Sequence, residues 1–293
     1  MLRLPDGTLD PATQTYIDSR QAEIDGLPNY ADRVARGKSL WDNKKGPNAG
    51  DAAFKVIRDE LEHMCFGAVR CAYCNDSAAD EIEHVLPKDF FPDQAFRWSN
   101  YVFACGPCNG TYKSNKYAYL DARGRRHDVT RVGGAVLTPP PVGRHALIDP
   151  RTENPLNFLT LDLLANDPVH GWIEGEFLVV PLPRLRAADR VRAEYTRETL
   201  GLNRQLLLDA RRNAYGSFRA RIVEYAGAKA GGAPQIRLDA LRDGILRMPH
   251  PMVFVEMQRQ RRHKPLKDLF APVPEALTWT FGRLAPVTRP APA

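Results

Sequence analysis

The chain has 293 residues, 43% of them hydrophobic, which is enough for one large domain or two smaller ones with a real core. No run approaches the ~18 apolar residues of a membrane helix, and residues 1–10 lack the apolar stretch of a signal peptide. We therefore expect a cytoplasmic protein with no membrane partner. The formal net charge of +6 permits a polyanionic partner without proving one.

The first 65 residues carry two helical patterns. A short one covers residues 12–24, and a polar stretch follows over 43–50. A clearer amphipathic pattern covers residues 51–65, where Phe54, Ile57 and Leu61 recur at helical spacing. Both segments are predicted to be helices. Cys65 ends the second one and is expected to be a core residue.

Two Cys-x-x-Cys pairs follow, Cys71 with Cys74 and Cys105 with Cys108. Four thiolates in paired two-residue spacing suit one tetrahedral Zn²⁺. A closed Cys₄ site leaves no position for a reactive water, so we expect a structural zinc that supplies folding free energy. Two redox-active pairs are the alternative, but no thioredoxin-like βαβ pattern surrounds them.

Between the pairs, alternation over residues 80–87 predicts a strand that contains Glu83 and His84. A regular strand would point these two side chains to opposite faces, so a shared site requires a bend or a bulge. The apolar run 101–104 predicts a second strand, with Asn100 at its start. Taken alone, Asn100 is typical of a turn.

After the second Cys pair, Asn109 begins a predicted helix on which Lys113 and Lys116 lie about one turn apart. Taken alone, Asn109 is typical of a helix N-cap, and the two lysines are typical of a solvated surface.

The segment 122–154 is rich in Gly, Pro and Arg and predicts an irregular connection, and residues 171–180 predict a hairpin with Glu174-Gly175 at or beside its turn. Further on, Gly201 is expected to end one helix and Asn203 to cap the next. The predicted C-terminal helices cover residues 188–200, 204–226, 237–247 and 252–263.

The last part of the chain contains a basic run and a proline-rich tail. Residues 259–263 are predicted to present a basic helix face that could follow a phosphate backbone, and an ordinary charged surface is equally consistent with them. The tail from residue 271 is rich in proline and is expected to be frayed.

The succession of Glu83-His84, Asn100, the second Cys pair and Asn109 resembles the HNH endonuclease superfamily, the ββα-metal nucleases. The last position is Asn here where many members have His. Residues 81–88 and 98–116 are similar to the HNH nuclease subunit of Septu-type and retron-associated anti-phage defence systems. A looser similarity continues downstream, over residues 147–150, 154–158 and 199–204.

This resemblance implies an α+β fold, with a ββα-metal core on a structural Cys₄ zinc site and a mostly α-helical C-terminal portion. The implied divisions are an N-terminal extension (1–50), a zinc-stapled nuclease module (51–120), a connection with a β-hairpin (121–187), a helical region (188–270) and a proline-rich tail (271–293).

The resemblance also implies metal-dependent hydrolysis of DNA phosphodiester bonds. His84 is the expected general base, because an imidazole titrates near neutral pH. Glu83 and Asn109 are expected to hold one divalent cation, Mg²⁺ or Mn²⁺, through oxygen ligands. Asn100 would fix the loop that carries His84 instead of binding metal, and Glu81 would help to orient the metal or its waters.

The expected substrate is double-stranded DNA, with Lys113 and Lys116 contacting phosphate. Two alternatives stay open at this point. The zinc-stapled unit could grip nucleic acid without cutting it, or the chain could be a nuclease subunit that acts only when an ATPase partner assembles on its helical portion.

Overall fold

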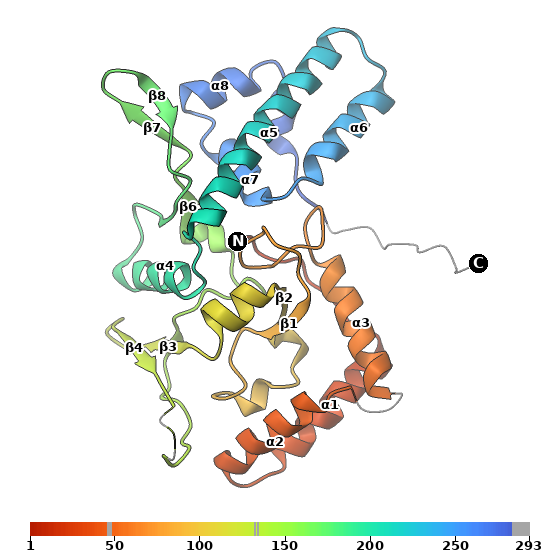
Figure 1. Ribbon diagram of the computed structural model, residues 1–293, viewed down its shortest axis with the longest axis vertical. Coiled ribbons are helices and arrows are strands. Elements are labelled where there is room, and N and C mark those ends of the chain that lie inside the picture. Colours follow the sequence, from red (N-terminus) through yellow and green to blue (C-terminus); the bar gives the residue numbers. More distant parts are fainter. Residues whose placement is uncertain (46–48, 132, 134, 283–293) are drawn as a thin grey trace, which may run out of the picture.

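The computed structural model describes residues 1–45, 49–131, 133 and 135–282, and within them the protein is an α+β structure of helices and small antiparallel sheets (Figure 1). Helices α1 and α2 lie at one end of the molecule and α5, α6 and α8 at the other. The strand pair β1–β2 lies between these two groups. None of the described helices combines the length and the hydrophobicity that are needed to span a bilayer.

Three helices open the chain: α1 (Pro11–Asp25), α2 (Tyr30–Asp42) and α3 (Ala49–His63). The Asp10 carboxylate accepts two backbone N–H groups of the first turn and so caps α1. Helices α1 and α3 confirm the two helical predictions. The sequence did not predict α2, which buries only a few residues against its neighbours.

The centre of the molecule is the antiparallel pair β1 (Glu81–His84) and β2 (Tyr101–Ala104). Two 3₁₀ turns, η1 (Pro92–Gln94) and η2 (Trp98–Asn100), lie in the loop between the strands. A π-helix, η3 (Pro107–Lys113), follows β2 directly. Helices α1 and α2 both pack against η1, so the N-terminal helices support the loop between the two central strands.

The segment after η3 is less irregular than expected. It contains a three-stranded sheet of β3 (Tyr117–Leu120), β4 (Arg126–Val129) and β5 (Arg144–His145). Two further antiparallel pairs follow in the chain. They are β6 (Leu159–Leu161) with β9 (Val179–Pro181), and β7 (Leu164–Asp167) with β8 (Gly171–Glu174).

The predicted hairpin within residues 171–180 is wrong, because β8 pairs with β7, the strand that precedes it in the chain. The turn lies before Gly171, where the Asp167 carboxylate accepts the backbone N–H groups of Val169 and His170. Gly171 adopts a φ of 71°, which favours glycine. Gly175 is required for another reason, since a Cβ there would lie 2.6 Å from the Asp162 carbonyl oxygen.

Five helices make up most of the C-terminal portion: α4 (Ala187–Thr199), α5 (Gln205–Ala230), α6 (Gln235–Leu246), α7 (Pro251–Arg259) and α8 (Lys264–Phe270). Gly201, with a φ of 55°, follows α4 as predicted. Asn203 does not cap α5. Its side chain instead pairs with both backbone groups of Val179, at 2.8 and 3.0 Å, and so ties the start of α5 to β9.

The predicted helix over 252–263 ends early, because α7 ends at Arg259 and α8 begins only at Lys264. The run 259–263 therefore does not form one helical face, and Arg259 pairs with Glu256 at 2.6 Å. The tail is not frayed over the part that is described. A short turn, η5 (Pro274–Thr278), is followed by Trp279, whose ring packs against Tyr225 at 4.9 Å. Residues 283–293 of the predicted tail lie outside the described residues.

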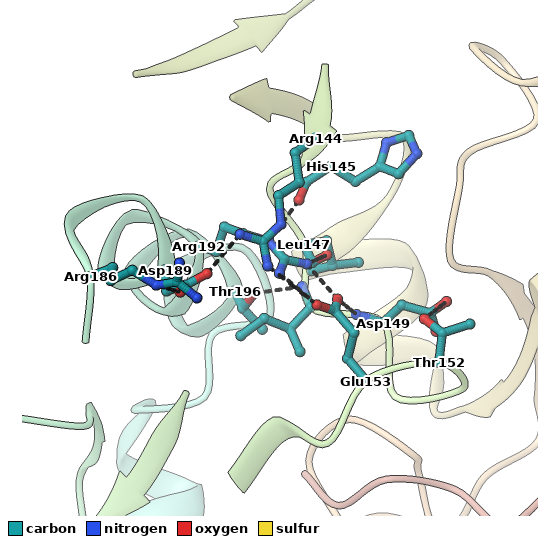
Figure 2. A network of polar contacts seen from close by, with 11 residues as sticks. Arg144, His145, Leu147, Asp149, Thr152, Glu153, Arg186, Asp189, Arg192 and Thr196 are labelled. Carbon is teal, nitrogen blue, oxygen red and sulfur yellow. Dashed lines mark hydrogen bonds and ion pairs between the residues drawn. The ribbon is translucent and has the colours of Figure 1, made fainter. Parts of the chain in front are cut away.

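Arg192 of α4 joins the C-terminal helices to the centre of the fold (Figure 2). Its side chain is only 2% exposed and binds the Glu153 carboxylate through both terminal nitrogens. The same guanidinium donates to the carbonyl groups of His145 at 2.8 Å and Leu147 at 3.2 Å. One arginine thus satisfies a carboxylate and two backbone acceptors between α4 and β5.

We expect Arg192→Met to lower the free energy of unfolding by about 3–5 kcal/mol, because it leaves Glu153 with the longer contact to Arg144, at 3.6 Å, and leaves two backbone carbonyls without this donor. Arg186→Met, at the exposed end of the same network, removes the same charge and should change the free energy of unfolding by less than ~0.5 kcal/mol. Urea denaturation of both variants measures the difference. Equal stabilities would contradict the structural role of Arg192.

Candidate functional site

The four cysteines of the two Cys-x-x-Cys pairs come together in one buried cluster. Their Sγ atoms all lie within 4.8 Å of one another, and those of Cys74 and Cys105 are 3.9 Å apart. A tetrahedron with Zn–S bonds of about 2.3 Å has edges of about 3.8 Å. The cluster therefore fits a structural zinc, which would tie the turn before β1 to the turn after β2.

The surroundings of the cluster also suit a metal-thiolate centre. The guanidinium of Arg204 lies 3.9 Å from Cys108 Sγ, where its positive charge favours the thiolate. Cys65 lies outside the cluster. Burial raises the pKa of its thiol to about 11, and the thiol contacts the Leu61 carbonyl at 3.4 Å. Cys65 is thus the core residue that the sequence predicted.

A pocket of about 300 Å³ lies between β1 and η3. Glu83, His84 and Asn109 all line it, together with Lys88 and Lys113. Glu83 and His84 are neighbours on a strand, and both are almost completely buried. Both side chains therefore line the same cavity at the end of β1, as a shared site requires.

The protonation state of His84 follows from its one hydrogen bond. Its Nε2 lies 2.9 Å from the Ala95 carbonyl oxygen, which can only accept, so Nε2 carries the proton and Nδ1 keeps its lone pair. Burial lowers the pKa of His84 to about 3, well below the near-neutral pKa that the sequence analysis expected, and this keeps the ring neutral at physiological pH. The Trp41 ring packs edge-on against the imidazole at 4.2 Å and holds its orientation.

Lys113 is buried in the pocket wall instead of lying on the surface. Its ammonium forms an ion pair with the Glu83 carboxylate and donates to the His84 carbonyl at 2.7 Å. Burial raises the pKa of Glu83, and the Lys113 charge opposes that rise. Lys113 therefore links both β1 residues to the end of η3.

The predicted helical spacing of Lys113 and Lys116 is wrong, because η3 ends at Lys113. Ser114 takes a φ of 48°, and its N–H donates to the Asn109 carbonyl at 2.6 Å. The chain then leaves the helix, and Lys116 is exposed in the following segment. Both lysines were expected to contact phosphate, but only Lys116 is exposed, because Lys113 is buried against Glu83.

Asn109 lies inside η3 and is not its N-cap, because the helix begins two residues earlier at Pro107. Its amide nitrogen donates to the Glu81 carboxylate at 2.7 Å. This bond orients the side chain and leaves the amide oxygen as the atom that could act as a metal ligand. Glu81 thus contacts the site through Asn109.

Asn100 closes the loop between β1 and β2. Its amide oxygen accepts the Leu86 N–H at 2.8 Å, and its amide nitrogen donates to the carbonyls of Leu86 and Gln94, both at 3.0 Å. Ala95, which follows Gln94, is the residue whose carbonyl binds the His84 imidazole. The three hydrogen bonds of Asn100 therefore fix the backbone at Leu86 and at Gln94, on either side of the imidazole.

The sequence analysis missed Trp41, which α2 brings against His84. Two lysines flank its ring, with Lys44 Nζ at 4.6 Å and Lys88 Nζ at 6.0 Å from the centroid. The only signal in the sequence was the combination of Trp41 with Lys44 and Lys45, since aromatic and basic residues often occur together at nucleic-acid sites.

Comparison with known proteins gives one similarity. The chain is 30% identical over 91 residues to the Septu protein PtuB of Bacillus thuringiensis. The matched region covers 28% of this chain and 30% of that protein, so the chain spans less than a third of the relative's length. No family model matches the chain, and no solved structure matches it.

Proposed function

We propose that this protein is an HNH-type, metal-dependent endonuclease that cuts double-stranded DNA in anti-phage defence. The observation that carries the proposal is the single pocket lined by Glu83, His84 and Asn109 beside a Cys₄ cluster. The order of two strands, β1 and β2, followed by the short helix η3 supports the proposal, because a ββα-metal core requires two strands and then a helix. The similarity to a Septu protein supports the defence role.

The donors in the pocket suit a hard divalent cation. The Glu83 carboxylate and the Asn109 amide oxygen are the oxygen ligands that Mg²⁺ or Mn²⁺ prefers, and two protein ligands leave positions for water and phosphate oxygens. Such a cation would neutralise charge on the phosphate and on the departing 3′ oxygen. Glu81 keeps Asn109 in place through its hydrogen bond to the amide nitrogen.

His84 supplies the base. Its neutral ring offers Nδ1 to take a proton from the water that attacks phosphorus, while the Ala95 carbonyl keeps Nε2–H fixed. Trp41 and the loop closed by Asn100 prevent the ring from turning away. Lys113 holds the backbone carbonyl of His84 as well as Glu83, so the base and the metal ligand move as one unit.

Supercoiled plasmid provides the test, with Mg²⁺, with Mn²⁺ and with no added divalent cation. Omitting the cation is preferable to chelation, which would also strip the zinc. We expect nicking that requires the cation, either by the chain alone or only together with an ATPase partner. DNA that is bound but stays uncut under all these conditions would instead support the non-cleaving binding module.

A further inference from the structure

A second pocket, of about 290 Å³, lies on the far side of Asn109 from Glu83 and His84. Asn109 lines both pockets, so the second one adjoins the candidate metal site. Its walls come from β1, from α3 and from the end of α2. Three cationic side chains line it, those of Lys44, Lys45 and Arg58.

These three cations have no carboxylate partner among the residues that the structure describes, although many of the other basic side chains do. Arg58 donates to the carbonyl of Asp80 at 2.7 Å, and Lys44 lies over the Trp41 ring. The carboxylates of Asp80 and Glu81 also line the pocket, and Glu81 accepts a hydrogen bond from Asn109. Three cations therefore face two carboxylates, and the pocket keeps a net positive charge.

The cations also crowd one another. Burial lowers the pKa of Lys44, and the nearby charges of Lys45, Lys88 and Arg58 lower it further, while Asp42 raises it. Lys88 lines the first pocket, 6.0 Å from the centroid of the Trp41 ring, and it too has no carboxylate partner in the described part of the chain. Unpaired cations in the candidate hydrolytic pocket and in the pocket that adjoins it match a polyanion that passes across both.

The loop that carries Lys44 is held in place by the N-terminal helices. The Tyr16 hydroxyl of α1 donates to the Lys44 carbonyl at 3.2 Å. A Cβ at Gly50, in the first turn of α3, would lie 2.5 Å from the same carbonyl oxygen, so only glycine allows this close approach. The position of Lys44 is thus built into the packing of α1 against α3.

We propose that helices α2 and α3 carry a phosphate-binding site for the DNA strand that is cut. Lys44, Lys45 and Arg58 bind backbone phosphates beside the scissile bond, and Lys88 lies in the candidate cleavage pocket itself. This proposal rests on the proposed endonuclease function and gives the first 58 residues a part in substrate binding. These contacts go to the backbone, so they carry no base preference.

The test is the salt dependence of DNA binding by the full chain. Fluorescence anisotropy with a labelled 30-base-pair duplex, without added divalent cation, gives log K against log [NaCl]. Log K falls as log [NaCl] rises, and each phosphate contact contributes about 0.9 to the steepness of this fall. Replacing Lys44, Lys45 and Arg58 by Gln removes three contacts and should make the negative slope shallower by about 2–3. Plasmid nicking should fall with the affinity. A Lys44→Gln/Lys45→Gln double variant keeps the hydrogen bond from Arg58 to the Asp80 carbonyl. It should make the negative slope shallower by about 2.

The matched control removes three exposed cations of the C-terminal portion, in or directly after α6 and in α8, by Arg237→Gln, Arg247→Gln and Lys267→Gln. These three also have no ion pair within the described residues. We expect wild-type slope and affinity from the control, and wild-type zinc content and melting temperature from all variants. An equal slope in wild type, test and control variants would overturn the phosphate site, while plasmid cleavage by the wild type would leave the endonuclease standing. A wild type that neither binds nor cuts DNA would overturn both.

Discussion

His84→Ala is expected to lower the rate of plasmid nicking by about 10²–10⁴-fold, which is the contribution of a positioned general base. The structure makes this expectation specific, because Nδ1 keeps its lone pair while Nε2–H is held by Ala95. DNA affinity should stay near that of wild type, because the imidazole is neutral and contributes no charge to phosphate binding. The measurement is initial nicking rate with Mg²⁺, together with anisotropy on the same protein.

His63→Ala is the matched control for this variant. The chain contains the same Glu-His dipeptide at residues 62–63, where His63 ends α3 and lies 3.6 Å from Glu60. Its removal should leave nicking unchanged. If His84→Ala nicks plasmid at the wild-type rate, or if His63→Ala loses activity to the same extent, His84 is not the base.

The second large effect is expected at the cysteine cluster. Cys105→Ser or Cys71→Ser removes one of four thiolate ligands from a buried tetrahedron. Structural zinc supplies about 10–16 kcal/mol in small zinc-folded peptides, so its loss is comparable with the whole stability of a domain. We expect zinc content to fall below one ion per chain and the melting temperature to fall steeply. Nicking would be lost indirectly, because β1 and η3 would no longer be held together.

Cys65→Ala provides the control, since it removes a buried thiol that lies outside the cluster. It should keep one zinc per chain and lose only about 1 kcal/mol of stability. Metal analysis and thermal unfolding measure both quantities. Unchanged zinc content and melting in Cys71→Ser and Cys105→Ser would contradict the Cys₄ assignment.

Local patterns were enough to predict much of the fold. Helices α1, α3, α4, α5 and α6 were predicted within a few residues of their bounds, α3 from the spacing of its apolar residues, and the two central strands follow from alternation and from a short apolar run. The spacing of the cysteines was enough to predict their cluster, since two-residue gaps suit a tetrahedral metal wherever the pairs meet. Whether Glu83, Asn100 and Asn109 have the roles expected of them stays a prediction.

Other features depend on partners far away in the chain. Asn203 bonds to β9 instead of capping α5, and β8 pairs with β7 instead of with the residues that follow it. In each case a local preference of a fraction of a kcal/mol competes with tertiary hydrogen bonds and burial, which contribute more. The local sequence pattern does not show whether the local interaction or the tertiary one forms.

The sequence by itself determined which side chains could do chemistry: the four thiols of the two Cys-x-x-Cys pairs, the Glu83-His84 pair, and two asparagines at fixed intervals. Only the tertiary structure decided where their neighbours lie. It buried Lys113 against Glu83, and it brought Trp41 and Lys44 from the first 50 residues to His84. Contacts of this kind depend on how α2 and η3 pack around β1, and packing between elements remote in sequence is not encoded in the local pattern of either one.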